Sequence, residues 1–166
     1  MTDRPIIFSG PMVRAILEGH KTQTRRVCKL QAFAYVPQYG LYPPSPYGVP
    51  GDRLWVRETF MATLGGIVFA ADGGDHYGAG GKLKWKPSLF MPRWASRLTL
   101  EIVNVCVERL QEISEDDAFA EGVNTGDWLG DPVGEYAKLW DSINAKRAPW
   151  ASNPWVWVVE FRKAAK

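Results

Sequence analysis

The chain has 166 residues, of which 46% are apolar and 23% charged, the proportions of one ordinary globular domain. Folding at this length buries roughly two-thirds of the surface, which excludes a disordered tail, a fibrous repeat and a disulfide-built miniprotein. No stretch approaches the ~20 apolar residues of a membrane helix, and residues 1–10 lack the apolar run of a signal peptide. Two distant cysteines, Cys28 and Cys106, form no CxxC pair, so we expect a reducing cytoplasm and no zinc site.

The net charge of +2 is unevenly distributed along the chain. Residues 1–100 carry a net charge of +7, residues 101–145 carry −9, and residues 146–166 carry +4. One interpretation is a basic face that meets a polyanion, with an acidic segment elsewhere. The other is that the acidic stretch forms an ordinary solvated helix surface.

Hydrophobic periodicity predicts few helices and several strands. In chain order we expect a strand at Ile6–Ser9, a helix at Pro11–Glu18 that ends at Gly19, and a strand that starts near Thr22. The remaining predictions are strands at Asp52–Phe60, Ile67–Ala71, Arg97–Leu110 and Trp155–Arg162, helices at Ser114–Glu121 and Pro132–Ala145, and loops at 37–51 and 72–88 rich in Pro or Gly. Because these strands do not alternate with helices, they favour a small mixed barrel over a doubly wound sheet.

Two of the predicted strands carry more detailed expectations. The apolar positions of Arg97–Leu110 switch from Leu98, Leu100 and Ile102 to Val103, Val105 and Val107. A slip by one residue predicts a β-bulge within one long strand. Trp155–Arg162 has apolar residues on both faces, so we expect both faces to be covered.

The segment Gly19-His20-Lys21-Thr22-Gln23-Thr24-Arg25-Arg26 concentrates chemically active groups. In a strand Thr22, Thr24 and Arg26 share one face, and Lys21 at the bend reaches toward Thr24. A lysine beside arginines has a lowered pKa, which makes it a better base. The alternative is that threonines suit strands and the cations are a solvated or phosphate-facing cluster.

This segment resembles the Gly-x-Lys-Thr-x-Thr-x-Arg signature of ASCH domains, β-barrels related to the PUA RNA-binding domain. The segments Gly51–Val56, Leu110–Val123 and Trp155–Arg162 are similar to later elements of the family. The resemblance implies an α+β fold, a small mixed β-barrel of about five to six strands with short flanking helices. It also implies a single domain over 1–166, with loop insertions near 31–51 and 61–93. More narrowly, Met91–Arg97 and Pro149–Pro154 look like ASCH-like proteins of phages and prophages.

The resemblance also implies candidate catalytic residues. Some small ASCH proteins are amidohydrolases that remove the acetyl group from N4-acetylcytidine with a Lys, a Thr and a Glu, without metal or cofactor. Lys21 and Thr24 fall on the motif, and Glu121 matches the glutamate of the helix after the long strand. Lys21 would deprotonate Thr24, Thr24 would attack the amide carbonyl, and Glu121 would manage the proton of the leaving amine. The alternative for Glu121 is a solvated carboxylate at a helix end.

Cations interleaved with aromatic residues suggest a surface for single-stranded nucleic acid, where bases stack and phosphates pair. We assign Trp140, Trp155 and Trp157 to the core and expect Trp85 and Trp94 to be exposed. The candidate binding residues for substrate or nucleic acid are His20, Thr22, Arg25, Arg26, Lys84, Trp85, Arg93, Trp94 and Arg97.

Three hypotheses follow for the function. The first is a PUA-like module that binds RNA, single-stranded nucleic acid or a nucleoside in the cytoplasm. The second is a metal-independent amidohydrolase of a modified nucleoside, and the third is a phage accessory protein that binds a host protein in the host cytoplasm without catalysis. The motif residues favour the first two, whereas the insertions are equally compatible with the third.

Overall fold

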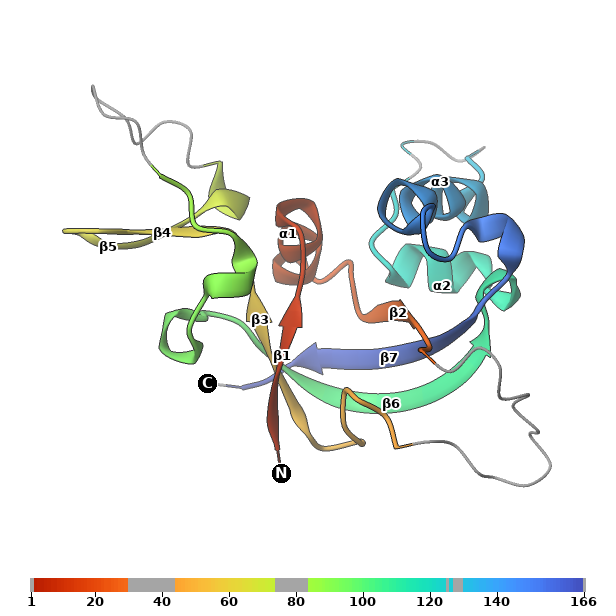
Figure 1. Ribbon diagram of the computed structural model, residues 1–166, viewed down its shortest axis with the longest axis horizontal. Coiled ribbons are helices and arrows are strands. Elements are labelled where there is room, and N and C mark those ends of the chain that lie inside the picture. Colours follow the sequence, from red (N-terminus) through yellow and green to blue (C-terminus); the bar gives the residue numbers. More distant parts are fainter. Residues whose placement is uncertain (1, 30–43, 74–83, 125, 127–129, 166) are drawn as a thin grey trace.

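The computed structural model describes residues 2–29, 44–73, 84–124, 126 and 130–165, and its architecture is α+β as predicted (Figure 1). Parts of the two predicted loops, residues 37–43 and 74–83, lie outside the described residues, as does the beginning of the insertion expected near 31–51. The main sheet has five strands in the order β1-β3-β6-β7-β2. These strands are β1 (Asp3–Ile7), β2 (Gln23–Val27), β3 (Arg53–Arg57), β6 (Thr99–Arg109) and β7 (Trp155–Lys163).

The sheet is mostly antiparallel, with one parallel pair between β1 and β3. Among the described residues the sheet does not close into a barrel, because β1 and β2 are its two edges. A side chain spans these edges instead: Arg26 Nη2 donates a hydrogen bond of 2.7 Å to the backbone oxygen of Ile7. The small mixed barrel expected from the sequence is, among the described residues, a mixed five-stranded sheet whose edges do not pair.

A separate hairpin replaces part of two predicted strands. The strand expected over Asp52–Phe60 ends at Arg57, and β4 (Phe60–Thr63) pairs with β5 (Gly66–Phe69) in a second sheet. This hairpin projects away from the main sheet (Figure 1). Its base packs on Met91 and Ala95, which form a small core of their own with Phe60.

The predicted bulge in the long strand is confirmed. The register between β6 and β7 shifts between Ile102 and Asn104, where the apolar positions change faces. The bulge lets one continuous strand serve two cores, since it redirects the side chains that follow it.

Strand β7 is covered on both faces, as predicted. Val159 and Phe161 pack with β1, β3, β6 and α1 (Gly10–Glu18) in a first core. Val156 and Val158 pack in a second core with α2 (Glu115–Ala120) and α3 (Pro132–Asn144). Figure 1 shows α2 and α3 side by side near the far end of β6, with α1 separate from them. Strand β2 lies where these two cores meet, and it carries the candidate functional site.

The three helices form where the sequence signals place them. Helix α1 ends at Gly19, whose φ of +86° is the left-handed conformation that glycine adopts without steric cost. Helix α2 begins after Ser114, which accepts a hydrogen bond from Asp117 N in a reciprocal capping box. None of the helices in the described part of the chain is long and apolar enough to cross a membrane.

Candidate functional site

The motif segment runs between the end of α2 and strand β7. Lys21 forms an isolated antiparallel bridge with Glu121, and Thr22 N donates to Ala120 O at 2.8 Å. On the other side Phe161 N donates to Thr22 O, also at 2.8 Å. The backbone thus fixes Lys21 against Glu121, although 100 residues separate them in the sequence.

Gly122 allows this close approach. Its φ is +88°, and a Cβ at this position would lie 3.2 Å from the Cβ atoms of Ala15 and Lys21. A larger residue would therefore need both a left-handed backbone and more space. The absence of a side chain at Gly122 lets the end of α2 pack directly against Lys21.

Lys21 and Glu121 form a buried ion pair. Lys21 Nζ lies 2.7 Å from Glu121 Oε2 and donates a second hydrogen bond of 2.7 Å to the backbone oxygen of Glu121. Both residues are 3% exposed. Burial lowers the pKa of Lys21 below its usual value, Glu121 opposes this shift, and the positive charges of Arg26 and Arg25 add to it. The result is an amine that loses its proton more readily than a surface lysine.

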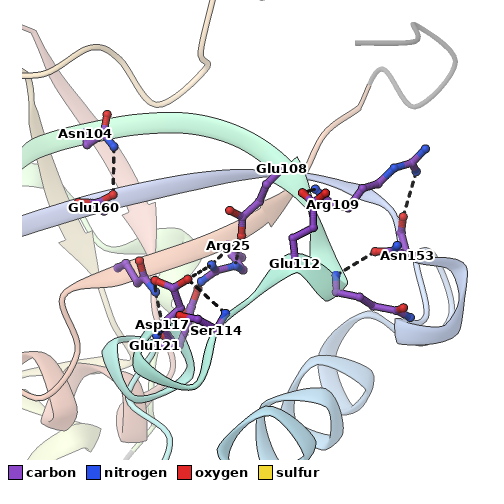
Figure 2. Close-up of polar contacts among 12 residues, drawn as sticks. Arg25, Asn104, Glu108, Arg109, Glu112, Ser114, Asp117, Glu121, Asn153 and Glu160 are labelled. Carbon is purple, nitrogen blue, oxygen red and sulfur yellow. Dashed lines mark hydrogen bonds and ion pairs between the residues drawn. The ribbon is translucent and has the colours of Figure 1, made fainter. Parts of the chain in front are cut away.

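Arg25 lies on the face of β2 that contacts α2, and three carboxylates surround it (Figure 2). Its Nη2 lies 2.6 Å from Glu108 Oε1 and 3.2 Å from Asp117 Oδ2, and its Nη1 lies 3.3 Å from Glu121 Oε1. Arg25 is only 4% exposed. Its side chain is therefore buried and its charge already compensated, and a contact of Arg25 with a substrate or phosphate stays a prediction.

Thr24 and Arg26 lie on the opposite face of β2. Thr24 pairs with Val159 across the sheet, and directly opposed residues share a face, so Thr24 lies on the side of the first core. Phe8 of this core contacts both cations: Lys21 Nζ is 5.7 Å and Arg26 Cζ 5.2 Å from the ring centroid. Thr24 is 4% exposed. The strand thus orients the threonine toward the side where Lys21 and Arg26 converge.

Arg26 retains a donor for a ligand. Its Nη2 is engaged with Ile7 O, whereas its Nε is buried and has no hydrogen-bond partner in the described part of the chain. A buried N–H without a partner costs free energy of about 1–3 kcal/mol, so it marks a place where an acceptor would be favourable.

Two arginines among the candidate nucleic-acid-binding residues, Arg93 and Arg97, form ion pairs within the protein. Arg97 makes two hydrogen bonds to buried Glu58, at 2.9 and 3.0 Å, and two more to Asp72 at 2.8 Å. Arg93 pairs with Asp3 at 2.9 Å. The Arg97 guanidinium therefore binds two carboxylates, and its contact with nucleic acid stays a prediction.

Phe90 and Trp94 lie on two short 3-10 turns, Ser88–Phe90 and Arg93–Ala95. Trp94 is 76% exposed as predicted, and Leu89 and Phe90 are exposed nearby in the sequence, whereas Trp85 is only partly exposed. Lys84 is exposed, and so are His20 and Thr22 in the motif segment that precedes β2. Lys21 and Arg25 are buried, so neither side chain contributes its charge to an exposed basic surface.

The described residues contain no group of three or more His, Cys, Asp or Glu side chains arranged to hold a metal ion. An open depression lies between α1 and the turn at Ala70–Asp72, and its lining includes none of the predicted site residues.

No family model matches the chain, and no curated protein is similar enough in sequence to match it. Among solved structures, the chain is similar to an ASCH domain from Lactobacillus crispatus, with a TM-score of 0.53 and 14% identity over 98% of this chain and 79% of that one. Two further matches are the hypothetical protein PH0355 (TM-score 0.48, 12% identity, 98% of this chain and 100% of that one) and a protein from Enterococcus faecalis assigned to DUF984 (TM-score 0.47, 13% identity, 99% and 80%). The chain has an ASCH-type fold.

Proposed function

We propose that this chain with an ASCH-type fold binds a pyrimidine nucleoside, free or within single-stranded RNA, and hydrolyses an N-acyl amide on its base, as in N4-acetylcytidine. One observation carries the proposal: the Lys21 amine is buried against Glu121 at 2.7 Å. A general base and its proton partner must lie within hydrogen-bond reach of each other, and a lysine acts as a base only when its pKa is lowered.

The neighbouring groups supply the other roles. Thr24 offers a hydroxyl on the face of β2 where Lys21 and Arg26 lie beside the Phe8 ring. Arg26 Nε offers an unpaired N–H for the oxyanion of a tetrahedral intermediate.

The proposed reaction balances with water as the only co-substrate. Neutral Lys21 accepts the Thr24 hydroxyl proton, and Oγ1 attacks the acyl carbonyl to form a tetrahedral intermediate. The bond between the acyl carbon and N4 of the base then breaks. The proton held between Lys21 and Glu121 goes to the leaving N4 amine. Water hydrolyses the acyl-threonine and releases acetate, which leaves cytidine as the other product.

The test is incubation of the protein with N4-acetylcytidine, and separately with a short single-stranded RNA that contains this base. Released cytidine and acetate are measured by mass spectrometry. We expect turnover that Thr24→Val and Lys21→Met abolish, while Thr63→Val in the exposed β4–β5 hairpin has wild-type activity.

The substrates and variants separate three outcomes. Turnover of the nucleoside alone identifies a nucleoside hydrolase, and turnover of only the oligonucleotide identifies an RNA-modifying enzyme. Saturable binding without turnover, at enzyme concentrations that would detect one turnover per hour, contradicts catalysis and leaves an RNA- or nucleoside-binding module.

A further inference from the structure

We propose that Arg25 is a positioning residue for this site: it holds the Glu121 carboxylate between two cations, so that Glu121 keeps a partner when Lys21 gives up its proton. The expected effect of Arg25 on activity rests on the proposed function. Its effect on the charges of Glu121 and Lys21 is argued from the contacts of Arg25 and needs no catalysis.

The two oxygens of Glu121 have different partners. Oε2 accepts from Lys21 at 2.7 Å, and Oε1 accepts from Arg25 at 3.3 Å. Two cations on separate oxygens fix the rotation of the carboxylate as well as its position, which a single lysine with three rotatable donors does not do.

Arg25 is itself held in place from two other elements (Figure 2). Glu108 of β6 accepts from both Arg25 Nε at 2.8 Å and Arg25 Nη2 at 2.6 Å, and Asp117 of α2 approaches Nη2 at 3.2 Å. Asp117 also accepts from Gln23 Nε2 at 3.0 Å, which ties β2 to α2 a second time. The guanidinium therefore has little freedom to leave Glu121.

The charge balance explains why a second cation is needed. If Lys21 alone compensated Glu121, deprotonation of Lys21 would leave a buried carboxylate without a partner, which costs several kcal/mol. Arg25 keeps its proton at any pH where the protein is folded, so its charge is permanent. With Arg25 in place, Lys21 can exchange its proton while the Glu121 carboxylate keeps a cationic partner.

The charged groups that face Lys21 in the described part of the chain agree with this role of Arg25. Lys21 faces Glu121 from the end of α2 and the cations Arg25 and Arg26 from β2, with the Phe8 ring beside its ammonium. Tyr136 of α3 faces the cluster from the second core; burial, with Glu121 in addition, raises its pKa well above the usual value, so it stays neutral. Glu108 and Asp117 contact Arg25 rather than Lys21. Arg25 and Arg26 both add to the lowering of the Lys21 pKa that burial begins.

The test compares two variants with a matched control. Arg25→Met removes the charge, and Arg25→Lys keeps a charge but loses the planar fork that holds three carboxylates. Arg97→Met is the control, because Arg97 is also clamped by two carboxylates, Glu58 and Asp72, but lies elsewhere in the fold. Two quantities are measured for each protein: the pKa of Lys21 by NMR titration of its ε-carbon, without substrate, and the pH profile of kcat/KM with N4-acetylcytidine.

We expect Arg25→Met to raise the pKa of Lys21, because a neighbouring cation is lost while Glu121 remains. The acid limb of kcat/KM should move to higher pH by the same amount, with lower activity on that limb. Arg25→Lys should lie between Arg25→Met and wild type, and Arg97→Met should leave the Lys21 pKa and the acid limb in place.

Unchanged values in folded Arg25→Met overturn the inference. If Arg25→Met does not fold, Arg25→Gln decides, because it also removes the charge but can still hydrogen-bond the carboxylates, and a Lys21 pKa within about 0.2 units of wild type rejects the role. If the wild-type protein shows no turnover, the proposed function fails, and the NMR titration still accepts or rejects the control of the Lys21 pKa by Arg25.

Discussion

Removal of the Glu121 carboxylate should destabilise the protein by an amount that depends on pH. Glu121→Ala takes away the side-chain partner of a lysine that is only 3% exposed, 2.7 Å from the lost oxygen. Arg25 retains Glu108 and Asp117, so the uncompensated charge is that of Lys21. Breaking a buried pair by removing one partner costs about 3–5 kcal/mol, and we expect a loss in this range at pH 7.

The pH dependence follows from the pKa of Lys21. Glu121 raises this pKa against burial, so its removal lowers the pKa further. Loss of a neighbouring opposite charge shifts a pKa by about 1–3 units, and each unit corresponds to about 1.4 kcal/mol. At pH values between the Lys21 pKa of the folded variant and that of the folded wild type, Lys21 is protonated in the wild type and neutral in the variant. The difference in unfolding free energy between them must therefore shrink as pH rises through that interval.

Glu58→Ala is the matched control for this experiment. Glu58 is 1% exposed and makes two hydrogen bonds to Arg97, which keeps its charge at any accessible pH. Its removal should cost less than that of Glu121, because Arg97 retains Asp72 and is partly exposed, and the cost should be constant between pH 6 and pH 10. Urea unfolding followed by tryptophan fluorescence at several pH values measures both losses. A Glu121→Ala loss that is as constant as the Glu58→Ala loss, or that stays under about 1 kcal/mol, would refute the buried-pair argument.

Three further predictions concern other parts of the fold. Ser114→Ala should cost about 1 kcal/mol of unfolding free energy in urea titration, because it removes the N-cap of α2. Hydrogen bonds from Thr2 lower the pKa of Asp52 to about 2, so its stabilising contribution is complete above about pH 4 and is lost as pH falls toward 2; Asp52→Asn should weaken this acid dependence in thermal melts. Trp94→Ala should change stability by less than about 0.5 kcal/mol because Trp94 is 76% exposed, yet it should weaken single-stranded RNA binding at least fivefold in fluorescence anisotropy if Trp94 stacks on a base.

The sequence predicts the elements whose signals are local. The slip in apolar period at Ile102 is visible without a structure, since each residue of a strand reports the face it occupies. Gly19 and Ser114 mark helix ends through their own backbone or side chain. The break between β3 and β4 is not visible in the same way, because alternation continues through Thr59 and only the separate pairing of Phe60 with Phe69 shows that a new sheet begins.

The burial and pairing of the charged residues of the site could not be predicted from local sequence signals. Arg25 carries no sequence signal of burial, and a cation in a basic segment is expected to face solvent. The acidic segment provided the missing signal, because Glu108, Asp117 and Glu121 all belong to residues 101–145 with their net charge of −9. The basic segment supplies Lys21 and Arg25, and the two segments neutralise each other inside the fold.

The opposite charges of these two segments therefore assemble the site itself. Strand β2 and helix α2 are far apart in sequence, and their contact is mediated by the Lys21–Glu121 bridge, the Arg25 ion pairs and the Gln23–Asp117 hydrogen bonds. Burying several ionised groups at one contact is costly unless every one finds its partner. Only the docking of α2 that satisfies all of them avoids this cost, so the same contacts that orient Glu121 toward Lys21 also select the position of the helix.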